Sequence, residues 1–116
     1  MGSRAEASYK ELVKRLLRWP GMRERPEGDT PFGRSCARPS LRMNGARFAT
    51  FHLDEGRRLH VAFRIPPSLA EEVPEAARAP EGHLEARVDL SAKGGLERAE
   101  ELARRLYEVR TGKAPP

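Results

Sequence analysis

The chain has 116 residues, a size typical of one domain, because single domains most often contain about 100–150 residues. Its composition, 38% hydrophobic and 34% charged, is typical of a globular protein with a polar surface. No apolar stretch reaches the roughly 18 residues that a membrane-spanning helix needs, and no signal-peptide core follows Met1, so we expect a cytoplasmic protein with no membrane partner. The single cysteine, Cys36, excludes an internal disulfide and a multi-cysteine zinc site.

The positive charge of the chain is concentrated in its first half. Residues 1–64 contain 14 lysines and arginines against 7 acidic residues, whereas residues 65–116 contain 8 against 10. A basic half suits nucleic acid or another polyanion, because each neutralised phosphate releases counterions. However, arginine outnumbers lysine 18 to 4, and the chain has no glutamine. Genome composition or adaptation to heat produces the same bias, so both interpretations of the charge stay open.

The first predicted element is a helix over residues 8–19. Ser8 and Glu11 stand at the spacing of a capping box. Apolar residues follow at the i, i+3, i+4, i+7 spacing of a helix with one face in the core: Tyr9, Leu12, Val13, Leu16 and Leu17. Trp19 precedes a proline, and that position disfavours the α conformation, so we expect the helix to end there. Residues 20–40 are predicted to form a long loop rich in proline and glycine.

Residues 41–65 are predicted to form an antiparallel meander of three strands. In its last strand, alternate apolar residues share one face: Leu59, Val61, Phe63 and Ile65. Phe51 must share that face. This condition predicts a three-residue loop around Gly56, which pairs Phe51 with Leu59.

Two histidines are predicted on the outer face of this meander. The register makes Thr50 the partner of His60 and places His52 diagonal to His60, at roughly 7 Å. Two histidines could begin a metal site, but Arg58 and Arg64 surround them with positive charge, and no carboxylate or thiolate can be placed nearby. We therefore predict surface histidines and neither a metal nor another cofactor.

An apolar patch is also predicted on the outer face. Asn44-Gly45 is the strongest short hairpin signal in the chain, because a type I′ turn needs positive φ at both central residues. A two-residue turn there sets Leu41 opposite Phe48 on the outer face, with Met43 beside them. An apolar patch of this kind is expected to be shielded from water, either by the 20–40 loop or by a second chain. The second alternative predicts a homodimer whose interface contains Leu41, Met43 and Phe48.

The second half of the chain completes the predicted fold. We expect a short helix at 68–73, a half-buried strand at 83–90, a helix at 95–110 and a frayed tail at 111–116. Residues 1–116 thus form a single α+β domain in the order α-β-β-β-α-β-α. It has two layers, an antiparallel sheet of about four strands and helices packed on one face of it.

Short segments of the chain resemble two small families. The break Leu17-Arg18-Trp19-Pro20-Gly21, and the strand and helix of Gly82–Leu90 and Leu96–Tyr107, are similar to the luciferase-like domain family. The hairpin Met43-Asn44-Gly45-Ala46-Arg47-Phe48 and the strand end Phe63-Arg64-Ile65-Pro66-Pro67 resemble the YjbR/MmcQ-like family. The chain departs from both at His83-Leu84, where a tryptophan is common. The second resemblance implies a two-layer α+β fold and often a DNA-binding label, and neither family supplies a catalytic set.

Nucleic-acid binding is one alternative function. The candidate residues are the arginines of the basic half, namely Arg34, Arg38, Arg42, Arg47, Arg58 and Arg64. Stacking of bases on aromatic residues is not expected, because Phe51 and Phe63 are assigned to the core. The predicted binding is therefore electrostatic and independent of sequence.

A small ligand-binding protein or thiol-dependent enzyme is the other alternative. Cys36 lies between Arg34 and Arg38, which favours its thiolate form. The 20–40 loop would then act as a lid over a pocket containing Cys36, His52 and His60. The chain has no P-loop, dinucleotide-binding or GxSxG motif. The sequence therefore favours a basic interaction or binding domain without a catalytic constellation over an enzyme.

Overall fold

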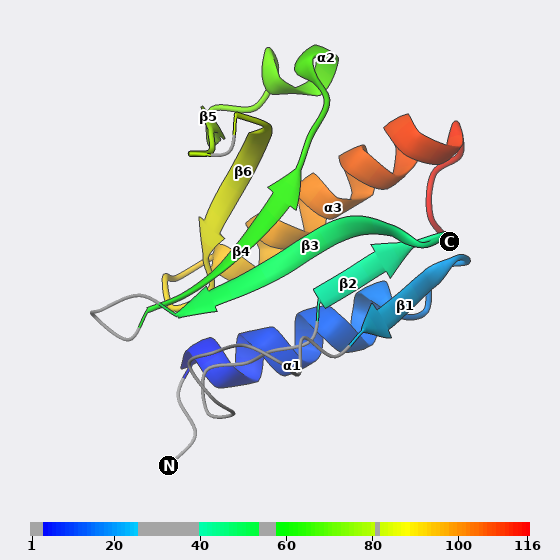
Figure 1. Ribbon diagram of the computed structural model, residues 1–116. Coiled ribbons are helices and arrows are strands. Elements are labelled where there is room, and N and C mark those ends of the chain that lie inside the picture. The colour runs from blue at the N-terminus through cyan, green and yellow to red at the C-terminus, as the bar shows by residue number, and fades with distance from the viewer. Residues whose placement is uncertain (1–3, 26–39, 54–57, 81) are drawn as a thin grey trace.

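Six strands form one antiparallel sheet, and two long helices cover one of its faces (Figure 1). The computed structural model describes residues 4–25, 40–53, 58–80 and 82–116. The strands, in the spatial order β1-β2-β3-β4-β6-β5, are β1 (Met22–Arg25), β2 (Ser40–Met43), β3 (Ala46–Leu53), β4 (Leu59–Arg64), β6 (Leu84–Asp89) and β5 (Ala76–Arg78). The helices are α1 (Arg4–Leu16), α2 (Pro67–Ala70) and α3 (Gly95–Thr111). The predicted α+β class, with helices on one face of an antiparallel sheet, is confirmed.

Several element boundaries differ from the prediction. Helix α1 already begins at Arg4, so Ser8 lies inside it and does not form the predicted capping box. Helix α2 is a single turn whose N-cap is Pro66, with no side-chain cap. The sheet also has two edge strands that were not predicted, β1 within the 20–40 segment and β5 before β6. The predicted fraying of residues 111–116 is wrong in part, because Thr111 ends α3 and Pro115 is buried.

The predicted register between β3 and β4 is wrong by two residues. Phe51 pairs with Val61 rather than with Leu59, and His52 lies directly opposite His60 rather than diagonal to it. The connection between the two strands is longer than the three residues expected, because the last observed pair is Leu53 with Leu59. The shift is an even number of residues, so Phe51 and the apolar residues of β4 keep the inward face that was predicted for them.

The apolar patch predicted on the outer face is instead part of the core. A β-bulge in β3 pairs Arg42 with Arg47 and Leu41 with Ala49, which leaves Phe48 without a cross-strand partner. The extra residue changes the alternation, so that Leu41, Met43 and Phe48 are all buried. The Phe48 ring meets the edge of the Phe63 ring, with centroids 6.0 Å apart. The exposed patch that motivated a homodimer is therefore absent.

The first and last helices hold the two ends of the described chain together. Helix α1 packs against α3 on the apolar face of the sheet (Figure 1). Just after α1, the Trp19 ring meets the edge of the Tyr107 ring of α3 at 5.3 Å. The Tyr107 hydroxyl donates a 2.7 Å hydrogen bond to the Pro20 carbonyl, which gives the buried phenol its polar partner. In the described part of the chain, both long helices therefore lie on the same face of the sheet.

Candidate functional site

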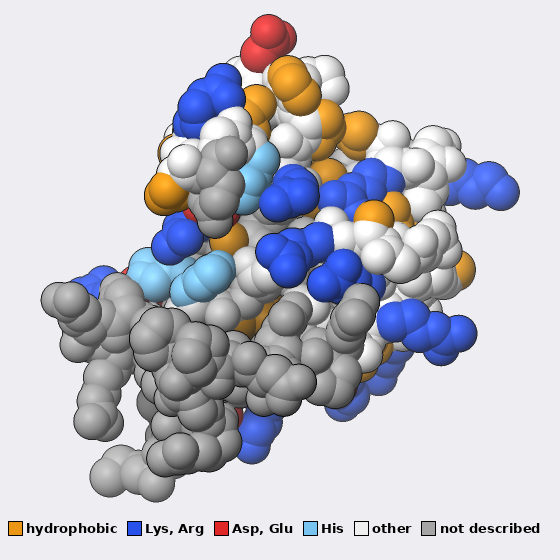
Figure 2. Space-filling view, in the orientation of Figure 1, with side chains coloured by type: hydrophobic (Ala, Val, Ile, Leu, Met, Phe, Trp, Pro, Cys, Tyr) orange, Lys and Arg blue, Asp and Glu red, His pale blue; other side chains and the backbone are white. Residues whose placement is uncertain are grey.

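The sheet face opposite α1 and α3 carries many ionisable side chains among the described residues. Successive strand residues point to opposite faces, so the large apolar residues of β4 and β6 face the helices, whereas the polar residues and Ala62 face outward. Figure 2 shows arginine and histidine side chains gathered on this outer face. Across β3, β4 and β6 they surround a shallow depression.

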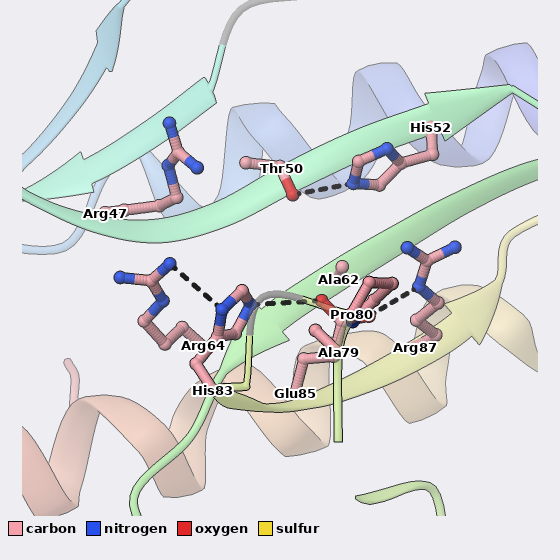
Figure 3. Close-up of a pocket in the computed structure, with 10 residues that line it drawn as sticks. All are labelled: Arg47, Thr50, His52, Ala62, Arg64, Ala79, Pro80, His83, Glu85 and Arg87. Carbon is pink, nitrogen blue, oxygen red and sulfur yellow. Dashed lines mark hydrogen bonds and ion pairs between the residues drawn. The ribbon is translucent and has the colours of Figure 1, made fainter. Parts of the chain in front are cut away.

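The depression is a pocket of about 180 Å³, which we call the arginine–histidine pocket (Figure 3). It is lined by Arg47, Thr50, His52, Ala62, Arg64, Ala79, Pro80, His83, Glu85 and Arg87. Ala62 is only 3% exposed although it points away from the helices, because the longer side chains of neighbouring strands surround it. The Ala62 methyl group is much shorter than the polar side chains around it, and this difference in length creates the pocket.

A continuous chain of polar contacts runs along one side of the pocket. Arg64 Nη2 lies 3.3 Å from His83 Nδ1, and His83 Nε2 lies 3.6 Å from Glu85 Oε2. The other oxygen of this carboxylate, Oε1, accepts a 2.8 Å hydrogen bond from Arg87 Nε. A guanidinium group can only donate, so His83 Nδ1 is the acceptor and carries no proton in this arrangement. Glu85 therefore receives contacts from both His83 and Arg87.

His52 lies across the pocket from this chain (Figure 3). Its Nε2 atom is 2.9 Å from the Thr50 hydroxyl, which fixes the ring orientation along β3. The residue keeps an exposed edge, but burial of the ring lowers the pKa of His52, and the charge of Arg87 lowers it further. His52 is therefore a neutral imidazole at neutral pH.

The pocket is strongly positive even with both histidines neutral. Three arginines face one carboxylate, Glu85, so the net charge of the lining is +2. Beneath the pocket, Arg110 of α3 donates from Nη2 to the Arg47 carbonyl at 2.8 Å and lies 5.3 Å from the centre of the Phe48 ring. Burial lowers the pKa of Arg110, and nearby Arg64 lowers it further. Arg110 thus fixes the backbone from which Arg47 projects.

The structure brings together only some of the residues proposed from the sequence. Arg47, Arg64 and His52 line the pocket, whereas His60 lies on the same face outside it. Arg58 pairs with Asp89 at 3.0 Å, away from the pocket. Arg42 lies opposite Arg47 on β2. The remaining candidates, Arg34, Cys36 and Arg38, lie outside the described residues, as does most of the proposed lid.

Sequence reasoning missed the contribution of β6 to the site. The alternation in residues 83–90 predicts a half-buried strand, which the structure shows as β6, and it places Glu85 and Arg87 on the outer face. Nothing in the sequence shows that β6 adds beside β4, which sets Arg64 opposite Glu85 and Ala62 opposite Arg87. Within the described residues no group of three or more histidine, cysteine or acidic side chains is placed to hold a metal ion.

Comparisons with known proteins do not identify a relative. No protein-family model matches the chain, and no significant match exists among the curated proteins or the solved structures. No helix in the described part of the chain is both long and apolar enough to cross a membrane. The pocket itself is therefore the basis for a functional conclusion.

Proposed function

We propose that this protein is a binding domain that holds an anionic group in the arginine–histidine pocket. The observation that carries the proposal is that Arg47, Arg64 and Arg87, from three adjacent strands, line one hollow whose lining contains a single carboxylate. Guanidinium groups suit this task, because their planar donors match the oxygens of carboxylate and phosphate groups. A fixed cluster of positive charge is stabilised when an anion enters it.

The size of the pocket limits what it holds. Pockets for drug-sized ligands begin at about 300 Å³, and this one has about 180 Å³. It therefore accommodates one charged group of a ligand, while the rest of the ligand extends outside the pocket. Arg87 donates a 2.8 Å hydrogen bond to Glu85, and this contact restricts the orientation of the Arg87 side chain.

Arg64→Gln is expected to weaken the binding of inorganic phosphate by roughly ten- to a hundredfold, because a hydrogen bond to a charged group contributes about 1.5–3 kcal/mol. Isothermal titration calorimetry measures the change. Arg4→Gln, an exposed substitution on α1 with the same loss of charge, is the matched control. An equal loss of affinity in both variants would show that only the overall charge matters, and absence of saturable binding by the unmodified protein would contradict the proposal.

Nucleic-acid binding is a second candidate, favoured by a row of arginines next to the pocket. Arg23 of β1 lies directly opposite Arg42 of β2, which lies opposite Arg47 of β3. Like charges placed opposite each other in a sheet disfavour folding, and a line of phosphates would offset their repulsion. Among the described residues the aromatic rings of β3 and β4 are buried, so such binding would depend on charge and not on base stacking.

The salt dependence of oligonucleotide binding tests this second function. In a filter-binding titration with single-stranded DNA, the double variant Arg23→Gln/Arg47→Gln is expected to reduce the slope of log K against log salt by about 1.4, since each phosphate contact contributes about 0.7. Arg4→Gln should leave the slope unchanged. Failure of the unmodified protein to retain DNA at low salt would reject nucleic-acid binding without affecting the anion pocket.

A further inference from the structure

The charge of the pocket indicates which class of anion it holds. The net +2 of its lining is neutralised by one dianionic group. Carboxylates, sulfate esters and phosphodiesters each carry a single negative charge, whereas a phosphate monoester carries nearly two above its second pKa of about 6. A tetrahedral dianion also presents three oxygens, so it can accept from more than one of the arginines that line the pocket.

We infer that the ligand group is a phosphate monoester and that His83 determines this specificity by taking up one proton when the monoester binds. The inference rests on the proposed anion-binding function. It extends that function by naming the ligand class and the residue that responds to it.

The contacts of His83 explain the linked proton. Its Nδ1 atom accepts from Arg64, so a second proton on the ring would displace that arginine. A bound phosphate attracts Arg64 and leaves Nδ1 facing an anion, while Glu85 remains 3.6 Å from Nε2. An imidazolium placed between two anions is favoured over neutral imidazole.

The other charged groups around His83 are compatible with this change. Arg87 of β6 is held by the Glu85 carboxylate, and Arg78 of β5 is hydrogen bonded to the Gly82 carbonyl. Burial and the charge of Arg87 lower the pKa of His52, on β3 across the pocket. Arg47 of β3 and Arg87 of β6 also line the pocket and remain available to the ligand as donors. The change proposed for His83 itself involves its contact with Arg64.

Binding and protonation are then thermodynamically linked. A ligand that favours protonated His83 must bind more tightly to the protonated protein, by the same factor. Because one proton is involved, the affinity falls by at most tenfold for each unit of rising pH. Below about pH 6 the monoester itself gains a proton and loses charge, so affinity falls there too. The expected pH profile is bell-shaped.

Three methyl esters of similar size test the ligand class. Methyl phosphate is a dianion at pH 7.5, whereas dimethyl phosphate and methyl sulfate are monoanions. Calorimetry is expected to show at least tenfold tighter binding of methyl phosphate than of either monoanion. Equal affinity for all three esters would overturn the inference while leaving anion binding intact, and no binding of any ester would remove the proposed function as well.

Proton uptake tests the role of His83. Titrations of methyl phosphate at pH 7.5, in two buffers with different ionisation enthalpies, give the number of protons bound with the ligand. We expect up to one proton for the unmodified protein and none for His83→Asn, whose amide oxygen can still accept from Arg64. His60→Asn, on the same sheet face but outside the pocket, should retain the uptake. Equal uptake in His83→Asn and the unmodified protein would overturn the inference.

The source of the monoester is a separate arm of the experiment. A 5′-phosphorylated oligonucleotide is compared with the same oligonucleotide ending in a 5′-hydroxyl and with methyl phosphate. Equal affinity for methyl phosphate and the phosphorylated oligonucleotide supports a small-molecule ligand. Tighter binding of the phosphorylated oligonucleotide than of both comparators supports the monoester and assigns it to a nucleic-acid end.

Discussion

Phe48→Ala is expected to lower the free energy of unfolding by about 3–5 kcal/mol, the usual cost of removing a buried phenyl ring. The ring is 0% exposed and packs against Phe63 from below the bulge in β3. It also lies 5.3 Å from the Arg110 guanidinium, so the substitution removes a cation–π contact as well as apolar packing. Urea unfolding followed by circular dichroism measures the loss.

Two comparisons make this result specific. Phe48→Leu keeps most of the buried volume and should cost less than the alanine substitution. Leu17→Ala removes an apolar side chain that is 37% exposed, so it should have a much smaller effect. If Phe48→Ala changed the stability by less than 1 kcal/mol, the ring would not lie in the core and the surface patch predicted from a two-residue turn would regain support.

Gly95→Ala is expected to destabilise the protein by about 3 kcal/mol or more, even though alanine is the better helix former by about 1 kcal/mol. Gly95 is the first residue of α3. A β-carbon there would overlap the Asp89 carbonyl oxygen and come within 3.2 Å of Leu90 Cα. That backbone has little room to move, because the Leu90 amide donates a 2.8 Å hydrogen bond to the Leu59 carbonyl. Steric overlap therefore outweighs helix propensity.

Gly82→Ala is the matched control for this substitution. Gly82 has a φ of 99°, but a β-carbon there would meet nothing within 4 Å. The expected cost is the backbone strain alone, about 1–2 kcal/mol. The difference between the two variants in thermal unfolding therefore measures the contact between α3 and the end of β6. Equal losses would mean that the overlap is relieved by a small shift of the helix.

Strong periodicity explains the parts of the fold that the sequence predicts. The alternation in residues 59–65 and 84–90 identifies the buried face of β4 and β6, and the spacing of residues 96–107 identifies α3. Weak or short patterns explain what was missed. β1 has the sequence Met-Arg-Glu-Arg, with Met22 as its only apolar residue, and it is a strand because it pairs with β2.

One inserted residue explains the largest error. Hydrophobic alternation assigns faces only if pairing is regular, and the bulge in β3 breaks this rule between Arg47 and Ala49. Before the bulge, Arg47 points outward. After it, both Phe48 and Ala49 are fully buried. No local residue preference marks such a bulge, because it is stabilised by the packing of distant elements such as Phe63.

Local alternation predicts only part of the candidate site, because the rest depends on which strands pair. Arg47, Arg64 and His52 follow from the polar alternation in β3 and β4, and all three line the pocket. Their chemistry changes when β6 brings His83 and Glu85 beside them. That pairing joins residues separated by about twenty positions and a short helix, so it depends on the topology of the sheet and not on any local pattern.

The packing of α1 on α3 has a consequence for how the protein is made. Strands β1 to β4 follow one another in the sheet, so they can pair soon after they leave the ribosome. Helix α1, which precedes the strands, can cover part of their apolar face, since Tyr9 packs against Phe51. The rest of that face is not covered until α3, which follows β6 in the chain, has been synthesised and Tyr107 can reach Pro20. During that interval the nascent chain displays apolar surface to solvent, which is the condition in which partly folded chains aggregate.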